Sequence, residues 1–168
     1  AVASGVVREL LGGQARCELF LVDTLLADLQ RRKDADELAL LAQSLAASDA
    51  ALAAAQREAR PGMSELDMCN LIHRVAAETV GAPVLVYGDF VSGPRCEEGG
   101  GMPSDRKIAP GDLVLLDYSV VLRGYRGDVC QTFVCQGRAS DQVRRMHEAC
   151  QAVHEVVAPL LCPGTPAR

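Results

Sequence analysis

The chain has 168 residues, of which 49% are hydrophobic and 23% are charged, a composition typical of one globular domain and not of a disordered or fibrous protein. The formal net charge is -5, with acidic and basic residues interspersed, which argues against nucleic acid or an anionic membrane as a partner. Polar residues interrupt the apolar stretch 38–55, so we do not expect it to span a bilayer, and the first residues lack the features of a secretory signal. These observations favour a cytoplasmic location for the protein.

The elements are expected in the order helix, helix, strand, hairpin, helix. Residues 1–30 carry weak, mixed patterns and are interpreted as a connector or the tail of a preceding domain. From Asp34, with Glu37 at the spacing of a capping box, an Ala- and Leu-rich helix runs to about residue 60. Ser64, with Asp67 at the same spacing, opens a second helix that ends near residue 81.

The hydrophobic period then changes to that of strands. Residues 84–87 begin a strand, and the polar, Gly-rich segment from Ser92 to Ser104 is a candidate active-site loop. Two β-branched-rich runs, 113–121 and 125–135, predict a hairpin, and a last helix starts near Ser140. This order predicts an α+β fold in which helices pack on one face of a mainly antiparallel sheet.

The cysteines and histidines give no sign of a separate site. Seven cysteines, an odd number, are scattered without a C-x-x-C pair or a nearby cysteine and histidine tetrad, so we expect reduced, mostly buried thiols. Three histidines and two loop glutamates are expected to be structural or exposed: His73, His147, His154, Glu97 and Glu98.

The predicted hairpin contains two aspartates whose spacing suggests a metal site. If residues 123 and 124 form a two-residue turn, Asp117 lies opposite Cys130 and Asp128 lies opposite Ser119. Asp117 and Asp128 are then diagonal neighbours on one face, with backbones roughly 7–8 Å apart. Converging carboxylates repel each other unless a positive charge lies between them, and divalent cations are hard ions that carboxylates bind and bridge.

A structural interpretation of these residues stays open. Asp128 could cap the turn, and Arg126, whose side chain projects on the same face, could neutralise both carboxylates. Asp117 is harder to explain structurally, because it interrupts a strand in which β-propensity disfavours Asp. Burying its carboxylate unpaired would cost several kcal/mol.

Residues 110–118 have the sequence PGDLVLLDY, and residues 124–128 have the sequence GYRGD. Together they resemble the pita-bread metallopeptidases, which include Xaa-Pro dipeptidase, aminopeptidase P and methionine aminopeptidase, with creatinase as a non-peptidase relative. Upstream segments agree with the resemblance, which covers roughly residues 25–168 and fits the Xaa-Pro branch better than the methionine branch. It implies that residues 31–168 are the first half of a pita-bread catalytic domain, apparently truncated.

The resemblance also implies a site and a substrate. Asp117 and Asp128 match two metal ligands of a centre that holds two Mn, Co or Zn ions, completed in the family by a histidine and two glutamates from the second half. The implied substrate is a peptide with proline in the second position, hydrolysed at its N-terminal bond, and a homodimer is left open. Because those other ligands lie beyond residue 168, the chain alone is expected to bind metal weakly or not at all and to be inactive.

The candidate loop departs from the family pattern. Many members carry a substrate-facing histidine at the eighth position of the segment that matches residues 93–100, and Gly100 occupies that position here. The substrate therefore loses a hydrogen bond of the kind that stabilises a developing oxyanion, and no catalytic residue is identified. A non-catalytic relative that binds a peptide or a protein partner and a creatinase-like C–N hydrolase remain alternatives.

Overall fold

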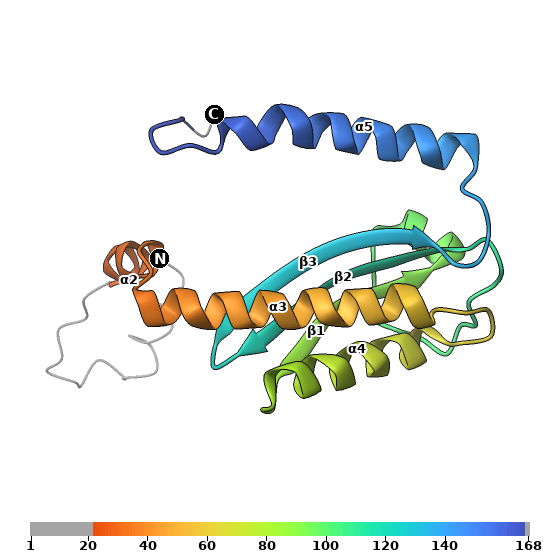
Figure 1. The fold of residues 1–168 in the computed structure, drawn as a ribbon, viewed down its shortest axis with the longest axis horizontal. Coiled ribbons are helices and arrows are strands. Elements are labelled where there is room, and N and C mark those ends of the chain that lie inside the picture. The colour runs from red at the N-terminus through yellow and green to blue at the C-terminus, as the bar shows by residue number, and fades with distance from the viewer. Residues whose placement is uncertain (1–21, 167–168) are drawn as a thin grey trace, which may run out of the picture. The chain divides into compact units, whose positions relative to one another are not determined.

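The computed structural model describes residues 22–166 and divides into two units, residues 1–39 and 40–168, which are considered separately (Figure 1). The first unit contains α2 (Asp23–Arg31), a helix without buried residues that the sequence analysis did not anticipate, and the start of α3 (Ala35–Glu58). Most of the predicted connector at residues 1–30 lies outside the described residues. Its boundary therefore stays a prediction.

The second unit is built on a three-stranded antiparallel sheet in the order β1 (Leu85–Ser92), β2 (Leu113–Leu122) and β3 (Tyr125–Val134). The turn between β2 and β3 has positive φ at both central residues, 51° at Arg123 and 88° at Gly124, as in type I′ hairpin turns. This two-residue turn pairs Leu122 with Tyr125 and sets the register of the whole hairpin. The predicted hairpin and its register are confirmed.

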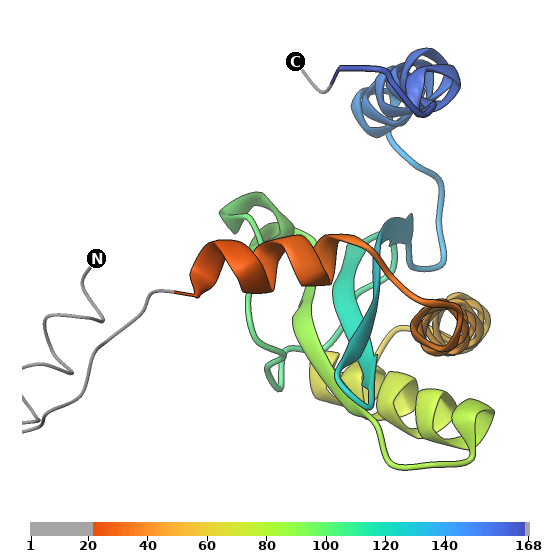
Figure 2. The same cartoon turned by 90° about the vertical axis from the view of Figure 1, so that its left-hand side faces the viewer.

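Helices α3 and α4 (Glu65–Val80) cover one face of this sheet, as both views show (Figures 1 and 2). The even-numbered residues of β2 point toward the helices and are fully buried, whereas most odd-numbered residues, Asp117 among them, are exposed or half-buried. The core on the helical face comprises Met68, Ile72, Phe90, Leu116, Tyr118 and Val120, among others. The sheet therefore has a packed face and an open face.

A row of small residues lets α3 approach the sheet closely. Its buried positions are all Ala or Ser. The Ser44 hydroxyl donates to the Val120 carbonyl at 2.5 Å, and the Ser48 hydroxyl donates to the Gly127 carbonyl at 2.9 Å. A Cβ at Gly127 would lie 2.5 Å from the carbonyl carbon of Ser44. Only glycine fits under the helix at this position.

The two remaining helices begin with side-chain caps. In α4, Ser64 and Asp67 form the predicted capping box, and Gly81 ends the helix in the left-handed conformation. The last helix, α5 (Asp141–Val157), starts at the predicted Ser140 cap, has no buried residue and is followed by a short 3-10 turn, η2 (Ala158–Leu160).

Within residues 22–166, α3 is the one helix long and apolar enough to cross a membrane by length and composition. Core helices pass the same test, and 33% of the apolar window of α3 is buried inside the protein. Because Ser44 and Ser48 hydrogen-bond to strand carbonyls, we interpret α3 as a core helix.

The expectation of mostly buried thiols is wrong for the described part of the chain. All six of its cysteines are free, as expected, but Cys130, Cys150 and Cys162 are exposed and only Cys135 is buried. The exposed thiols lie on the open face of β3, on α5 and after η2. Cys130 and Cys150 line a pocket between β3 and α5, which leaves both thiols exposed.

Replacing Gly127 with alanine is expected to force α3 away from β3. Because the clash is with backbone atoms of α3, we expect the free energy of unfolding to fall by about 2–3 kcal/mol. Urea unfolding of the natural full-length protein measures the change. Thr132→Ala, at an exposed position of the same strand, should change stability by about 0.5 kcal/mol or less. Equal effects of the two substitutions would contradict the close packing.

Candidate functional site

The open face of the sheet carries three aspartates, one on each strand. Asp117 of β2 lies opposite Cys130 and Asp128 of β3 lies opposite Ser119, as the sequence predicts, so both carboxylates project from the same face. The structure adds Asp89 of β1, which pairs directly with Asp117. Asp117 and Asp128 are exposed, whereas Asp89 is half-buried.

Neighbouring polar groups contact the two predicted ligands. The Ser119 hydroxyl donates a hydrogen bond of 2.7 Å to Oδ1 of Asp128. The Cys130 thiol is hydrogen-bonded to Asp117, and its pKa is raised by burial and then by the negative charges of all three aspartates. The thiol therefore lies near the three carboxylates, and its ionised form is disfavoured by their charge.

Arg126 does not neutralise this pair. Its guanidinium carbon lies 4.6 Å from the ring centroid of Tyr87, an arrangement typical of a cation–π interaction. No ion pair joins Arg126 to an aspartate within the described residues. The alternative in which Arg126 balances both carboxylates is therefore not realised.

The side chains of Asp117 and Asp128 are of the type that binds a divalent metal ion, but two carboxylates are too few to complete its coordination. Carboxylate oxygens are suitable ligands for such ions. However, no group of three or more His, Cys, Asp or Glu side chains within residues 22–166 is arranged to hold one. The metal-binding role of Asp117 and Asp128 therefore stays a prediction, and the chain supplies at most part of a centre.

The loop between β1 and β2 folds back against the aspartate face. It starts with a short 3-10 helix, η1 (Gly93–Glu98), and returns along β1, where the Phe90 N–H donates to the Gly101 carbonyl at 3.0 Å. Gly100 has φ of 119°, and a Cβ built on it would lie 2.2 Å from Oδ2 of Asp89. Residue 100, which the resemblance matches to a histidine of the family pattern, thus faces the Asp89 carboxylate and has no room for a side chain.

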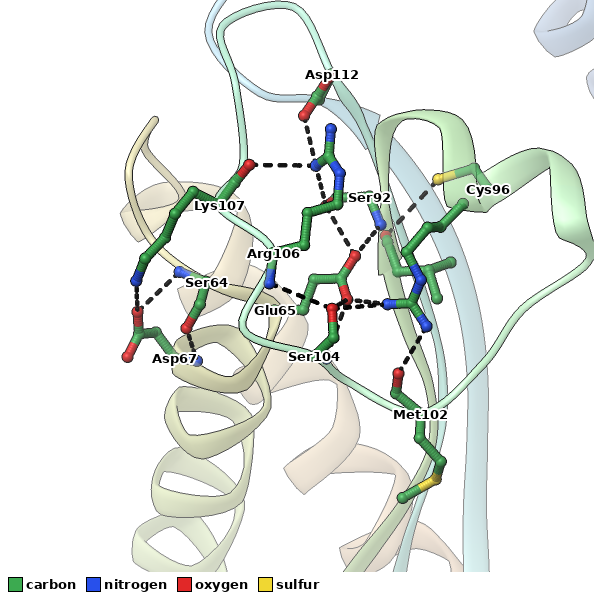
Figure 3. Close-up of polar contacts among 12 residues, drawn as sticks. Ser64, Glu65, Asp67, Ser92, Cys96, Met102, Ser104, Arg106, Lys107 and Asp112 are labelled. Carbon is green, nitrogen blue, oxygen red and sulfur yellow. Dashed lines mark hydrogen bonds and ion pairs between the residues drawn. The ribbon is translucent and has the colours of Figure 1, made fainter.

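A buried carboxylate holds this loop in place (Figure 3). Glu65, the first residue of α4, has only 1% of its side chain exposed. Its Oε1 accepts from Ser92 N and Oγ at 2.8 and 2.9 Å, and its Oε2 accepts from Ser104 N and Oγ at 3.0 and 2.7 Å. Arg95 completes the set with an ion pair to Oε2. The two ends of the loop are therefore tied to one helix terminus.

The hydrogen bonds outweigh the cost of burying this charge. Burial alone raises the pKa of Glu65, but the hydrogen bonds from Ser104 and Ser92 lower it below its ordinary value. The pKa of Asp112 is also lowered overall. Burial raises it, but hydrogen bonds from the Arg106 guanidinium, at 2.8 Å, and from the Ala109 N–H lower it. Both carboxylates are therefore charged at neutral pH.

Asp89 and Glu65 are the two residues that sequence reasoning missed. The strand was predicted to begin at residues 84–87, and extending it to Ser92 with period two would have placed Asp89 on one face with Asp117. Glu65 gave no local signal. It directly follows the Ser64 cap and reads as an acidic first-turn residue, and its partners are 27 and 39 positions away in the sequence.

Substituting Gly100 with alanine is expected to be more damaging than the same change at its neighbour. Gly99 also has positive φ, 86°, but a Cβ there meets nothing within 4 Å. Gly99→Ala should therefore lose about 1 kcal/mol of stability, whereas Gly100→Ala should lose roughly 3 kcal/mol, because it also displaces Asp89. Urea unfolding of both variants tests this. If the losses were equal, Asp89 would not occupy the space beside Gly100.

Neutralising Glu65 should loosen the loop in a pH-dependent way. Because the pKa of Glu65 is lower in the folded protein than in the unfolded chain, its ionised form stabilises the fold at pH values above the unfolded-state pKa of about 4.3. This contribution is lost as the pH falls through the folded-state pKa. Glu65→Gln is expected to cost about 3 kcal/mol at pH 7, and the gap to wild type should narrow below about pH 4. Glu97→Gln, at an exposed loop position, serves as the control. A gap independent of pH would contradict the assigned charge.

Comparison with known proteins supports the expected fold. Residues 39–168 match metallopeptidase family M24, whose members use two divalent metal ions. The chain is 30% identical over 132 residues to the uncharacterized peptidase YqhT of Bacillus subtilis, and this match covers 78% of the chain and 37% of that protein. It is 29% identical over 113 residues to the mitochondrial methionine aminopeptidase 1D of Danio rerio, covering 62% of the chain and 32% of the relative.

The fold also matches solved structures. The X-Pro aminopeptidase of Thermotoga maritima superposes with a TM-score of 0.80 at 20% identity, over 90% of this chain and 42% of that one. The chain thus spans less than half the length of each of these three proteins. The α+β arrangement of residues 40–157 is part of a pita-bread fold, as expected. The chain belongs to metallopeptidase family M24 and contains part of its catalytic domain.

Proposed function

We propose that the natural full-length protein hydrolyses the N-terminal bond of peptides, with a preference for proline in the second position, and that Asp117 and Asp128 are two ligands of its two-metal centre. The observation that carries the proposal is the hairpin register, which projects both carboxylates from the open face, while Arg126, the nearby basic side chain of β3, lies over Tyr87 and makes no ion pair with them within residues 22–166. Membership of a metallopeptidase family supplies the reaction class.

The described residues are suited to separate parts of this task. Asp117 and Asp128 would hold the metal ions, which when bound supply Lewis acidity and lower the pKa of a water molecule. Ser119 orients the Asp128 carboxylate through its hydroxyl. The loop held by Glu65 lies beside the same face and would position the peptide.

The preference for proline rests on the sequence motifs and on the fold match to an X-Pro aminopeptidase. Relatives named as methionine aminopeptidases match at similar identity, so a methionine preference is the alternative within the same reaction class. The metal itself, Mn, Co or Zn, is likewise left to experiment.

One observation favours a second candidate function. Gly100 stands where many relatives carry a substrate-facing histidine, and Asp89 fills the space beside it. A protein that has lost that contact can keep the scaffold and bind a peptide or a protein partner without cleaving it.

Titration with Mn(II) tests the metal-binding role. In the natural full-length protein, Asp117→Ala is expected to weaken Mn(II) binding by about a hundredfold or more, because loss of a direct ligand exceeds the tenfold to hundredfold effect of removing an outer partner. The rates at which the wild type hydrolyses Ala-Pro-Gly, Met-Ala-Gly and Ala-Ala-Gly then distinguish a preference for proline in the second position from a preference for N-terminal methionine. The 168-residue chain alone should bind the ion only weakly.

Asp105→Ala is the matched control, because this aspartate is exposed and lies in the loop, away from β2 and β3. It should leave the affinity for Mn(II) unchanged. Tight binding of Mn(II) by the Asp117→Ala variant would contradict the assignment of Asp117 as a metal ligand. Tight binding without hydrolysis of any of the three peptides would favour the non-catalytic candidate.

A further inference from the structure

We propose that Cys130 is a positioning residue of the metal centre, and that its thiol orients the Asp117 carboxylate through a hydrogen bond across the β2–β3 ladder. The inference rests on the proposed function, since Asp117 is one of the two proposed ligands. It assigns a role to a residue outside the predicted ligand set, and the contacts that carry it lie within the three strands.

The first step is the arrangement of ligands and donors in the hairpin. Asp117 of β2 pairs with Cys130 of β3, and Ser119 of β2 pairs with Asp128 of β3. Each carboxylate therefore has a side chain that can donate a hydrogen bond directly opposite, with Cβ atoms about 4.5–5.5 Å apart. The two carboxylates lie on one diagonal of this group of four residues, and the two donors lie on the other diagonal.

The second step is the hydrogen bond that each donor makes. The Ser119 hydroxyl donates to Oδ1 of Asp128 at 2.7 Å. The Cys130 thiol donates to the Asp117 carboxylate in the same way. The last torsion of an aspartate side chain is otherwise broad and roughly two-fold, so a donor that holds one oxygen restricts the rotation of the carboxylate. The other oxygen stays available for a metal ion.

The third step is the direction in which Asp117 is held. Asp89 of β1 pairs with Asp117 from the other side, so Asp117 lies between Asp89 and Cys130 in one row across the sheet. Like charges directly opposite each other repel, and Asp89 therefore disfavours positions of the Asp117 carboxylate near β1. The thiol favours positions near β3, the strand that carries Asp128. Both effects bring the Asp117 carboxylate toward Asp128.

Packing does not account for the contact between Cys130 and Asp117. Cys130 is exposed in the described part of the chain, and a thiol is a weak hydrogen-bond donor, so its removal should change the stability of the fold little. Removing an outer partner of a metal ligand, by contrast, typically lowers metal affinity by about tenfold to a hundredfold. Because the donor is weak, we expect an effect at the lower end of this range.

The test measures the affinity of the natural full-length protein for Mn(II) by calorimetry, with urea unfolding in parallel. Cys130→Ala removes the donor and is expected to weaken binding by about tenfold while leaving the urea midpoint nearly unchanged. Cys130→Ser keeps a donor at the same position and should stay within about threefold of the wild type.

Thr132→Ala is the matched control. It removes a hydroxyl from the same face of β3, but the residue opposite is Leu115, whose side chain cannot accept a hydrogen bond. This variant should bind Mn(II) as the wild type does. Unchanged affinity in Cys130→Ala would overturn the inference, as would a loss in Cys130→Ser as large as that in Cys130→Ala.

A double-mutant cycle assigns the effect to the carboxylate. If the thiol acts through Asp117, Cys130→Ala should cause little further loss of affinity in a protein that already carries Asp117→Ala. Combined with Asp105→Ala, it should still cause the full loss. Equal losses in the two backgrounds would contradict a role through Asp117. If Asp117→Ala binds Mn(II) too weakly for measurement, the comparison of Cys130→Ala with Cys130→Ser decides.

Failure of the proposed function would be seen separately. If the wild type binds Mn(II) tightly but hydrolyses none of the three peptides, the peptidase activity is refuted, while the affinities of the Cys130 variants still decide the role of the thiol. If the wild type does not bind Mn(II), the metal centre and the inference both fail.

Discussion

The register of the β2–β3 hairpin connects the core of this protein to its candidate site. Successive side chains of a strand alternate between faces, so a slip of one residue would turn Tyr118 and Leu116 to the outside and Asp117 into the core. The short type I′ turn at Arg123 and Gly124 prevents that slip. Helix α3 reinforces it, because Ser44 and Ser48 hydrogen-bond to carbonyls on both strands. The forces that bury the apolar face therefore also display the aspartates.

A buried charge organises the loop, which is an expensive solution unless every lone pair of the carboxylate is used. Glu65 meets this condition with four hydrogen bonds from Ser92 and Ser104 and an ion pair with Arg95. A smaller apolar side chain could fill the volume, but it would leave the buried amides of both loop ends without acceptors. The loop that approaches the aspartate face is consequently anchored on both sides of its Gly-rich tip.

Much of this architecture is predictable from local rules. The capping box at Ser64 and Asp67, the turn at residues 123 and 124 and the Ser140 cap each depend on residues close in sequence. The pairing of Asp117 with Cys130 followed from counting outward from that turn. By contrast, the length of β1 and hence the place of Asp89 depend on pairing with a strand that starts 21 positions after β1 ends. The partners of Glu65 are also distant in sequence, so no local sequence pattern predicts them.

The exposed thiols show a second limit of sequence reasoning. Cys130 was included in the general expectation of mostly buried thiols, but it is exposed on the same face of β3 as Asp128. Burial depends on what packs against a strand, and the strand's own sequence does not contain that information. The same openness gives Asp117, Asp128 and Asp89 their accessibility.

The relation between Asp89 and Gly100 couples the edge strand to the loop through one shared volume. A side chain on residue 100 and a carboxylate at residue 89 compete for one volume, so one can be exchanged for the other only as a pair. The exchange leaves the hairpin untouched, because Asp89 lies on the edge strand and residue 100 lies in the loop.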